Sequence, residues 1–580
     1  MEFGFVGPSY EAANPLQDMQ RLINWYVEID RAKDAKSPIA LLGTPGLETI
    51  LSTIFGEVRG GWVLPGNTSA LVVVSNIVYL LSVSTPATSI SKATFALTQI
   101  GTILSYTGQV SIRDNGVGGV AVIVDGTTNG YVYKVSTKAL TQINDPAFYG
   151  SDRVSFIDGW LVFNKPGTQI FYTSPLYWSG VPITLNNVQI TDTAGDFTCN
   201  AYDGVLSVGM KITVSGTLTG TGSINGYSNP TTYQISATNG STSFTLQTLT
   251  GGALTTTAGT TTGLTFQTGN SFDATYYALK DSSSDNLITH QENNRELWLL
   301  GERTSEVWYD AGGNYFPFSR LQGATLQYGC SAKHSLARLG NGSLIWLGRN
   351  ETGENIVLMS QGYQAFPVST PAVANAICGY PVISDAIGYT YIEDGHQFYM
   401  LTFPTADVTW CYDIATEMWH QRASYDPLLG QFHRHRSNCL LNLANQRIVG
   451  DYQNGNLYVM SRTVYQDGSN PLVAVRRTPH LWNDRKRVRI SALQVEFMAG
   501  QGVQSGQGIN PQAVLRISRD GGQTWGSEKW APMGKAGATL NRCMWRKLGI
   551  ARDAVFEVTV SDPVRRDVVG ATLTAESALT

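Results

Sequence analysis

The chain has 580 residues, with 60 Gly, 22 Pro and only 14% charged residues, whereas a typical soluble domain has about 25% charged residues. Its 42% hydrophobic content excludes disorder as the overall state. A net charge of −4 disfavours a general nucleic-acid-binding or membrane-surface protein. Because Thr, Val and Tyr are abundant, the composition favours strands over helices.

The first element that the sequence predicts is a short helix near the N-terminus. Asn14 can cap it, Pro15 suits the first helical position and Gln17 completes a capping box. Apolar residues then recur at helical spacing from 19 to 26, before alternation typical of a strand begins. The first residues hold no basic stretch followed by an apolar core, so we expect no secretory signal.

The longest apolar run, residues 70–83, is broken by Ser75 and Asn76. It is shorter than the roughly 20 residues that a membrane-spanning helix needs. We expect two strands joined by a tight turn at these two residues, and no membrane insertion.

One unit then recurs along the chain: an apolar strand, a turn with Gly, Asn or Asp, and an aromatic-rich strand. Four of the turn centres lie near Gly301, Gly348, Gly395 and Asn454, and are 47, 47 and 59 residues apart. Repetition at about 40–50 residues, with strands only, is typical of propeller blades. The copies of this unit are residues 120–135, 154–173, 296–312, 343–359, 389–403 and 447–461.

The regularity breaks between 188 and 268, a segment rich in Thr and Gly. No charged residue occurs from Ile212 to Ser271. A flexible linker has such a composition, but 232–237 and 243–249 alternate like strands around Asn239-Gly240, a strong hairpin signal. We therefore favour a small inserted β-sandwich.

The last part of the chain differs in charge. Residues 471–580 hold 16 Lys and Arg against 9 Asp and Glu, a net charge of +7, which leaves −11 for the rest. This asymmetry suggests a separate C-terminal β region. The predicted fold is all-β, with a β-propeller-like body, an inserted small β-sandwich domain and a C-terminal β region. The predicted divisions are 1–187 (N-terminal segment and first blades), 188–268 (insert), 269–470 (remaining blades) and 471–580 (C-terminal β region with an Asp-box).

The sharpest short motif is the Asp-box at 518–525, which has the pattern Ser-x-Asp-x-Gly-x-Thr-Trp. Its short polar side chains can bond the amides of a turn, glycine supplies permissive backbone angles, and the tryptophan can pack beneath the hairpin. The motif indicates a structural turn rather than catalysis. Its residues are Ser518, Asp520, Gly522, Thr524 and Trp525.

Two groups of basic residues are candidate binding sites. His433 and His435 lie at strand spacing and could hold a metal, but we find no acidic residue or cysteine near them in sequence, and favour a solvated basic loop at 433–436. A second group could contact phosphates or, as we prefer, a partner subunit. This group is Arg476, Arg477, Arg485, Lys486, Arg487 and Arg489.

None of the remaining motifs indicates a catalytic or metal-binding site. The six cysteines are far apart in sequence, which disfavours a disulfide framework or a zinc site and predicts buried, reduced thiols. We find no nucleophile elbow and no His-Glu-x-x-His motif. The chain is therefore expected not to be an enzyme and to carry no cofactor or metal.

Several stretches resemble one family, the tail hub or nozzle proteins of short-tailed bacteriophages, also called packaged-DNA stabilisation proteins. The opening of that family is similar to residues 14–26 and 42–47. Its central strand pair resembles 295–301 and 307–309, and its closing region resembles 515–525 and 545–549. Together these stretches span the chain apart from the insert.

The resemblance implies a structural virion protein in a phage tail, assembled in the cytoplasm of the bacterial host. It would form a homohexameric ring below the portal and its adaptor, and extend or close the DNA exit channel. It would retain packaged DNA, let genomic DNA pass at ejection without reading its sequence, and carry a tail needle, fibres or spikes. From the charge asymmetry we expect the acidic body to line much of the channel and the basic C-terminal region to face a partner protein.

Two other functions stay open. The Asp-box is known from sialidases, so the alternative is a glycan-binding or glycan-degrading β-propeller; the presence of one good copy of the box argues against it. Receptor binding through the 188–268 insert is compatible with a structural role in the tail.

Overall fold

A computed structural model describes nearly the whole chain. The described residues are 4–30, 37–53, 56–88, 92–117, 119–145, 147–178, 180, 184–201, 206, 208–268, 272–313, 316–350, 352–484 and 486–577. Over this part of the chain the structure is almost entirely β, as predicted, and its one α-helix is α1 (Pro371–Cys378). Thr370 caps this helix by accepting a hydrogen bond from the Val373 amide. No helix in the described ranges is long and apolar enough to cross a membrane.

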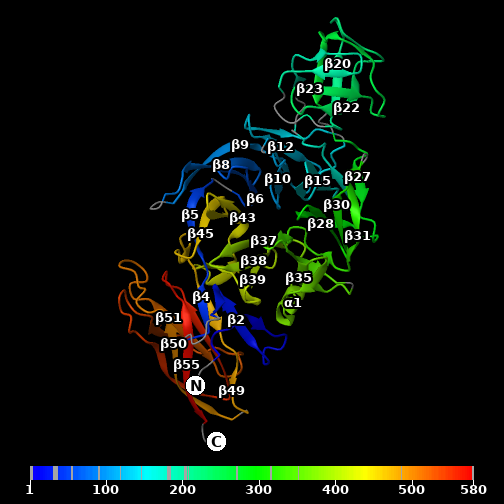
Figure 1. The fold of residues 1–580 in the computed structure, drawn as a ribbon. Coiled ribbons are helices and arrows are strands. Elements are labelled where there is room, and N and C mark those ends of the chain that lie inside the picture. Colours follow the sequence, from blue (N-terminus) through cyan, green and yellow to red (C-terminus); the bar gives the residue numbers. More distant parts are fainter. Residues whose placement is uncertain are drawn as a thin grey trace. The chain divides into compact units, whose positions relative to one another are not determined.

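The chain divides into two compact units. The first consists of Met1–Arg59, Val83–Ala96 and Leu326–Thr580, and the second of Gly60–Ser82 and Leu97–Thr325. Each contains antiparallel sheets with four main strands, together with one additional β domain; in the first unit further strands extend these sheets. The four-stranded sheets are the blades of the predicted β-propeller (Figure 1).

The blades of the second unit follow one another along the chain, apart from an insertion within the third. Buried aliphatic residues fill the middle strands. In the second blade, Ile123 packs with the first blade and Val122 with the third, so both faces of this sheet are covered. The strands, grouped by blade, are β6 (Val58–Val63), β7 (Ser69–Val74), β8 (Ile77–Thr85) and β9 (Thr94–Thr102); β10 (Ser111–Asp114), β11 (Val120–Val124), β12 (Gly130–Lys134) and β13 (Ala139–Gln142); β14 (Val154–Ile157), β15 (Trp160–Asn164), β16 (Ile170–Thr173) and β27 (Tyr277–Leu279); and β28 (Leu287–Asn293), β29 (Glu296–Gly301), β30 (Ser305–Asp310) and β31 (Phe318–Leu326).

The insertion lies between β16 and β27 and forms its own β domain, drawn in teal to green in Figure 1. Its buried core includes Phe197, Ile235 and Phe266 and is separate from the cores of the blades. The ladder of its main sheet runs β17-β26-β20-β22-β23-β19-β18-β25, and β21 and β24 form a short ribbon. The strands are β17 (Thr184–Leu185), β18 (Gln189–Ile190), β19 (Asp196–Thr198), β20 (Lys211–Gly216), β21 (Ser223–Ile224), β22 (Thr231–Thr238), β23 (Ser243–Gln247), β24 (Thr256–Thr257), β25 (Gly259–Thr260) and β26 (Leu264–Thr268).

The first unit holds three further blades. The last of them takes its fourth strand, β5, from the N-terminal part of the chain, where Leu47 pairs with Met460 of β45. Such pairing ties residues about 400 positions apart into one sheet. The strands are β32 (Gly329–Cys330), β33 (Ala337–Arg338), β34 (Leu344–Arg349), β35 (Asn355–Gln361) and β36 (Gln364–Pro367); β37 (Ile387–Glu393), β38 (His396–Phe403), β39 (Val408–Asp413) and β40 (Met418–Gln421); and β43 (Ser437–Leu443), β44 (Gln446–Asp451), β45 (Asn456–Ser461) and β5 (Gly46–Ser52). Beside the last two blades lies the hairpin of β41 (Ala423–Asp426) and β42 (Gln431–Arg434), and β46 (Gln466–Asp467) and β47 (Asn470–Pro471) extend the last.

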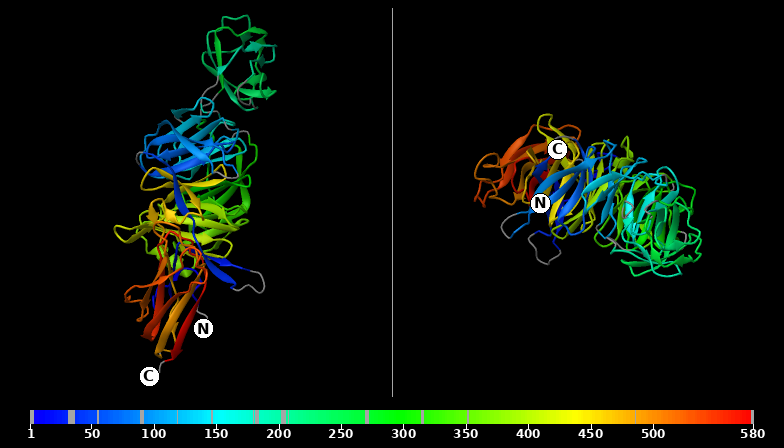
Figure 2. Two further views of the ribbon diagram at one scale, coloured as in Figure 1. Left: turned by 90° about the vertical axis from the view of Figure 1, so that its left-hand side faces the viewer. Right: turned by 90° about the horizontal axis from the view of Figure 1, so that it is seen from above.

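The additional domain of the first unit is a two-layered β-sandwich built from both ends of the chain. N-terminal strands, in blue, lie beside C-terminal strands, in orange and red, and both described ends of the chain lie here (Figures 1 and 2). One layer is β3-β4-β55-β50-β53 and the other is β2-β48-β54-β51-β52. The strands are β2 (Met19–Ile23), β3 (Trp25–Ile29), β4 (Ile39–Gly43), β48 (Ala474–Arg477), β50 (Val488–Phe497), β51 (Gln512–Ser518), β52 (Lys529–Pro532), β53 (Cys543–Ala551), β54 (Asp553–Val560) and β55 (Val568–Ser577); the short strands β1 (Tyr10–Glu11) and β49 (Leu481–Trp482) lie at its margins.

The predicted N-terminal helix is wrong. Residues 14–17 form a turn and residues 19–23 form β2, which pairs with β48 through Leu22 and Arg476. Asn14 accepts a hydrogen bond from the Leu16 amide, so it closes a local turn instead of capping a helix. Leu22 is 1% exposed in the core of the sandwich, and Ile23, also 1% exposed, packs on the opposite face of β2 with Ala423, Val473 and Val475. Burial on both faces of β2 therefore overrides the helical spacing.

Two turn predictions are confirmed. β7 and β8 are joined at Ser75 and Asn76, with Ser75 at φ +52°. Asn239 and Gly240 join β22 to β23, and Asn239 Oδ1 accepts three backbone amide hydrogen bonds there. All six cysteines lie in the described ranges and are free; four are buried as expected, Cys439 is partly buried and Cys378 is exposed.

Candidate functional site

The Asp-box forms a closed hydrogen-bond network at the end of β51. Ser518 donates to Asp520 Oδ1 at 2.6 Å and accepts from the Gly522 amide at 2.7 Å. Asp520 also accepts from the Thr524 amide at 2.9 Å and from its hydroxyl at 2.6 Å. These hydrogen bonds hold the pKa of Asp520 below its ordinary value. The motif uses its polar groups on its own turn, which is a structural role.

The glycine of the box lies against the N-terminal turn. Gly522 has φ +91°, and a Cβ atom at this position would lie 2.0 Å from the Met19 sulfur. At Gly521, a Cβ atom would lie 3.0 Å from Leu16. The Asp-box therefore packs on the residues for which a helix was predicted, and this turn joins the two ends of the chain.

We expect Gly522→Ala to destabilise the sandwich by about 1–3 kcal/mol, because the new methyl group meets both a positive φ and a steric clash. Thermal unfolding of the purified chain measures the effect. Gly506→Ala is the matched control, since Gly506 has φ +79° but nothing within 4 Å of its added Cβ atom. Equal losses in the two variants would contradict a role for the contact with Met19.

Arg476, expected at a partner or phosphate contact, is instead buried at 0% exposure. Its guanidinium donates to the Phe5 carbonyl at 2.5 Å, the Pro8 carbonyl at 2.9 Å and Gln20 Oε1 at 2.7 Å. Burial lowers the pKa of Arg476 to about 9. Arg476 therefore anchors the N-terminal segment and is not available to a ligand.

Arg477 is also used within the sandwich. Its guanidinium lies 2.8 Å from Glu557 Oε2 and 3.5 Å from Glu11 Oε1. It also lies over the indole of Trp525, 5.0 Å from the ring centre, as does Arg516 at 5.7 Å. The Asp-box tryptophan thus makes cation–π contacts rather than filling a core beneath the hairpin.

The other described residues of this basic group differ from Arg476 and Arg477 in their exposure. Lys486, Arg487 and Arg489 are exposed, the last on β50. Arg485 lies outside the described residues. The three exposed cations are the part of the predicted group that the structure leaves accessible to a partner.

The expected solvated loop at 433–436 is wrong. Arg434 is 8% and His435 1% exposed; Arg434 lies over the Tyr452 ring at 3.7 Å, and Arg436 pairs with Asp451 at 3.1 Å. His433 Nδ1 lies 2.7 Å from Asp407 Oδ2. These acidic and aromatic partners lie just before β39 and at or just after the end of β44, outside the local stretch that the prediction considered. Within the described residues, no group of three or more His, Cys, Asp or Glu side chains is arranged so that it could hold a metal ion.

A buried cluster around His396 has no counterpart in the sequence predictions. His396 Nδ1 lies 2.7 Å from Asp413 Oδ2, and Nε2 lies 2.6 Å from Glu28 Oε2. The hydrogen bond with Asp413, opposed by burial and reinforced by Glu28, raises the pKa of His396 to about 9. We call Glu28, His396 and Asp413 the carboxylate–imidazole clamp. It joins β3 of the sandwich to β38 and β39 of a blade, and no local motif marks it because its members lie far apart in sequence.

A second missed pair resembles part of a catalytic triad. Ser155 Oγ lies 3.0 Å from His290 Nδ1, but both residues are fully buried and His290 Nε2 faces the Arg153 carbonyl at 3.1 Å. Burial lowers the pKa of His290 to about 3, so the imidazole stays neutral. A substrate cannot reach this serine, and the pair serves to join β14 to β28.

Comparisons with known proteins agree with this architecture. A family model described as Bacteriophage P22 Gp10, beta-propeller, matches residues 207–465, from within the insert to just beyond β45. A second, described as Bacteriophage P22 Gp10, beta-sandwich, matches residues 474–576, from β48 into β55. No curated protein matches the chain.

One solved structure, described as the crystal structure of a Mitotic Checkpoint Complex, is 9% identical over 80% of this chain and 98% of that chain, with a TM-score of 0.34. A likeness this weak carries no argument about fold or function. The two family models instead match consecutive parts of the chain, in the same order as the blades and the sandwich. The chain belongs to the family of bacteriophage P22 Gp10, with that family's β-propeller and β-sandwich domains.

Proposed function

We propose that this chain forms the nozzle or hub ring of a short phage tail, where it extends or closes the DNA exit channel and retains packaged DNA. The family is one of structural phage tail proteins. The observation that carries the proposal is the consecutive match of both family domains. We further propose a homohexameric ring that contacts the portal-adaptor ring above and carries distal tail parts.

The structure supports a scaffolding role in two ways. Three histidines with the chemistry for catalysis or ligand binding make contacts inside the protein instead. His290 and His435 are buried, and His396 lies in the clamp. Two connections hold the sandwich to the rest of its unit: the clamp, and the strand pairing that continues from β40 into β2. We expect no enzymatic activity.

Phage particles lacking the chain provide the direct test. We expect DNA-filled heads that lose their genome to added nuclease, and expect the purified chain to restore protection when it is added to them. Electron microscopy of restored particles should place the chain in a ring at the tail. A chain that stays monomeric, is absent from particles and does not protect DNA would overturn the proposal.

The exposed cations of the sandwich supply a test of partner binding. We expect the triple variant Lys486→Glu, Arg487→Glu and Arg489→Glu to weaken incorporation into particles at least tenfold, because steering and docking of opposite charges fall when the sign is reversed. Incorporation is measured by quantitative immunoblotting of purified particles.

The matched control changes the same charge on blade strands and turns. Lys138→Glu, Arg303→Glu and Arg349→Glu alter three exposed cations outside the sandwich. Normal incorporation of the first triple variant would show that its cations do not face a partner, and equal loss in both would indicate an effect of net charge alone.

A further inference from the structure

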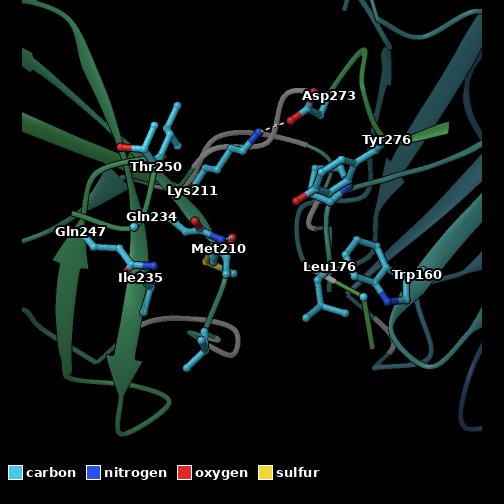
Figure 3. A pocket seen from close by; sticks show the side chains of 16 residues that line it. Trp160, Leu176, Met210, Lys211, Gln234, Ile235, Gln247, Thr250, Asp273 and Tyr276 are labelled. Carbon is cyan, nitrogen blue, oxygen red and sulfur yellow. Dashed lines mark hydrogen bonds and ion pairs between the residues drawn. The ribbon is translucent and has the colours of Figure 1, made fainter. Parts of the chain in front are cut away.

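A cleft of about 450 Å³ lies between the insert and the third blade of the second unit. Figure 3 shows its two walls facing each other, with Gln234, Ile235 and Gln247 on one side and Trp160 and Tyr276 on the other. The first wall belongs to β22 and β23, and Trp160 begins β15. A cleft of this volume lies within the usual range of roughly 300–1,000 Å³ for small-molecule sites.

The blade wall offers aromatic surface. Trp160 and Tyr276 are both partly exposed, and their rings meet edge to face with centres 6.2 Å apart. Leu176 lies beside them in the cleft (Figure 3). Such rings bind the apolar C–H faces of a ligand while their polar edges stay available for hydrogen bonds.

The insert wall offers neutral polar groups. The amide of Gln247 provides a carbonyl acceptor and two N–H donors. Gln234 provides its carbonyl and one N–H, because its Nε2 also donates to the Gly209 carbonyl at 3.3 Å. The hydroxyl of Thr250 lies on the same wall. Planar amides and hydroxyls are suited to ligands that carry several hydroxyl groups, since each ligand hydroxyl can both donate and accept.

The charges in the cleft cancel. Among its described lining residues the charged ones are Lys211 and Asp273, which form an ion pair across the two walls (Figure 3). Burial raises the pKa of Asp273, but hydrogen bonds from Lys211 and Thr275 outweigh that effect, and the pKa lies below its ordinary value. The Asp273 carboxylate therefore stays ionised at neutral pH, and its pairing with Lys211 leaves no net charge in the cleft to attract an anion or a cation.

We propose that this cleft binds a neutral saccharide, whose ring face stacks on Trp160 and whose hydroxyls bond Gln234 and Gln247. Aromatic surface on one wall, uncharged donors and acceptors on the other and a self-neutralised ion pair together match a polyhydroxylated ligand without charge. The site gives the insert a function, recognition of a neutral surface glycan, that the structural role of the chain does not require.

Isothermal titration calorimetry of the full chain with maltotriose, mannotriose and triacetylchitotriose tests the proposal. We expect at least one of these neutral trisaccharides to bind, and expect Trp160→Ala to weaken it by about tenfold. Gln247→Ala, which leaves the blade untouched, should weaken the same saccharide. Trp530→Ala is the matched control, because Trp530 is 61% exposed on β52 of the sandwich.

Each outcome of the calorimetry either supports or contradicts the proposed saccharide site. Saccharide binding that is weakened by both cleft variants and kept by Trp530→Ala supports the site. Thermal unfolding shows whether Trp160→Ala folds, and if it does not, Gln247→Ala decides. Failure of all three saccharides to bind, binding that neither cleft variant changes, or binding of a proline-rich decapeptide in their place would overturn the proposal. Because DNA retention is measured separately, failure here leaves the structural role untouched.

Discussion

A chain that lacks residues 1–45 is expected to lose its folded C-terminal sandwich. This deletion removes β2, β3 and β4, which pair with β48 and β55. It also removes Leu22, Trp25 and Leu41 from the core, where each is at most 1% exposed. Full burial of such a side chain contributes about 1.5–3 kcal/mol, so the loss approaches the 5–15 kcal/mol that stabilises a whole domain.

The test compares two versions of the isolated domain. Residues 470–577 alone are expected to aggregate or to show no dispersed NMR spectrum. The same segment fused through a Gly/Ser linker to residues 4–45 should give dispersed amide signals and a cooperative thermal transition. Restoration is expected because the linker returns the missing strands and the Trp25 indole, which donates to the Arg566 carbonyl at 3.0 Å.

A second deletion serves as the control. Replacement of residues 184–268 by a short Gly/Ser linker removes the insert, whose core is separate from that of the sandwich. The sandwich should unfold at its original temperature in this variant. A stable, well-dispersed fragment 470–577 would contradict the expectation that the N-terminal strands are an integral part of the domain.

The carboxylate–imidazole clamp is expected to make stability depend on pH. The pKa of His396 rises from an ordinary value near 6.5 to about 9 on folding. Protonation therefore favours the folded state: the contribution is complete below pH 6.5 and is lost as the pH rises through 9. At about 1.4 kcal/mol per unit of pKa, it amounts to roughly 3 kcal/mol.

Two aromatic neighbours of His396, Tyr26 and His420, do not titrate in that window. Burial raises the pKa of Tyr26, whose ring lies 5.1 Å from that of His396, far above 9. Burial lowers the pKa of His420 well below its ordinary value, so this imidazole stays neutral. The carboxylates of Glu28 and Asp413 face the two ring nitrogens of His396 as its partners in the clamp, and Glu393 lies opposite His396 in the pairing of β37 with β38.

His396→Gln tests this expectation. Unfolding free energies of the wild type and the variant, measured between pH 6 and pH 9.5, should differ most at pH 6 and converge toward pH 9.5. The wild type should lose more stability than the variant across the window, because the variant has no group to deprotonate there. A constant difference at all pH values would indicate that His396 contributes packing but not a charge-dependent interaction.

Sequence reasoning succeeded where the signal is local. The Ser75-Asn76 and Asn239-Gly240 turns depend on the backbone preferences of two residues, and both hairpins form. The Asp-box likewise uses residues only a few positions apart, and its side chains bond the turn that contains them. Such interactions are already specified by neighbouring residues in the chain.

Sequence reasoning failed where a residue distant in the chain makes the contact that decides the local structure. The spacing from 19 to 26 fits a helix, but pairing with β48 makes it a strand. Arg476 belongs to a run of cations that resembles a ligand site, yet backbone carbonyls of Phe5 and Pro8 occupy its guanidinium. Residues 433–436 are basic in sequence, but Asp407, just before β39, pairs with His433, and Asp451, at the end of β44, pairs with Arg436.

The sequence by itself determined the β class, the repeated hairpins, the Asp-box turn and the family resemblance, because alternation, turn residues and motif order are encoded over short stretches. Only the tertiary structure decided that the first strands belong to the C-terminal sandwich, which cations are exposed, and that Trp160 faces Gln247 across a cleft. These features depend on residues tens to hundreds of positions apart. Burial and strand pairing bring those residues together, and no local pattern in the chain records the result.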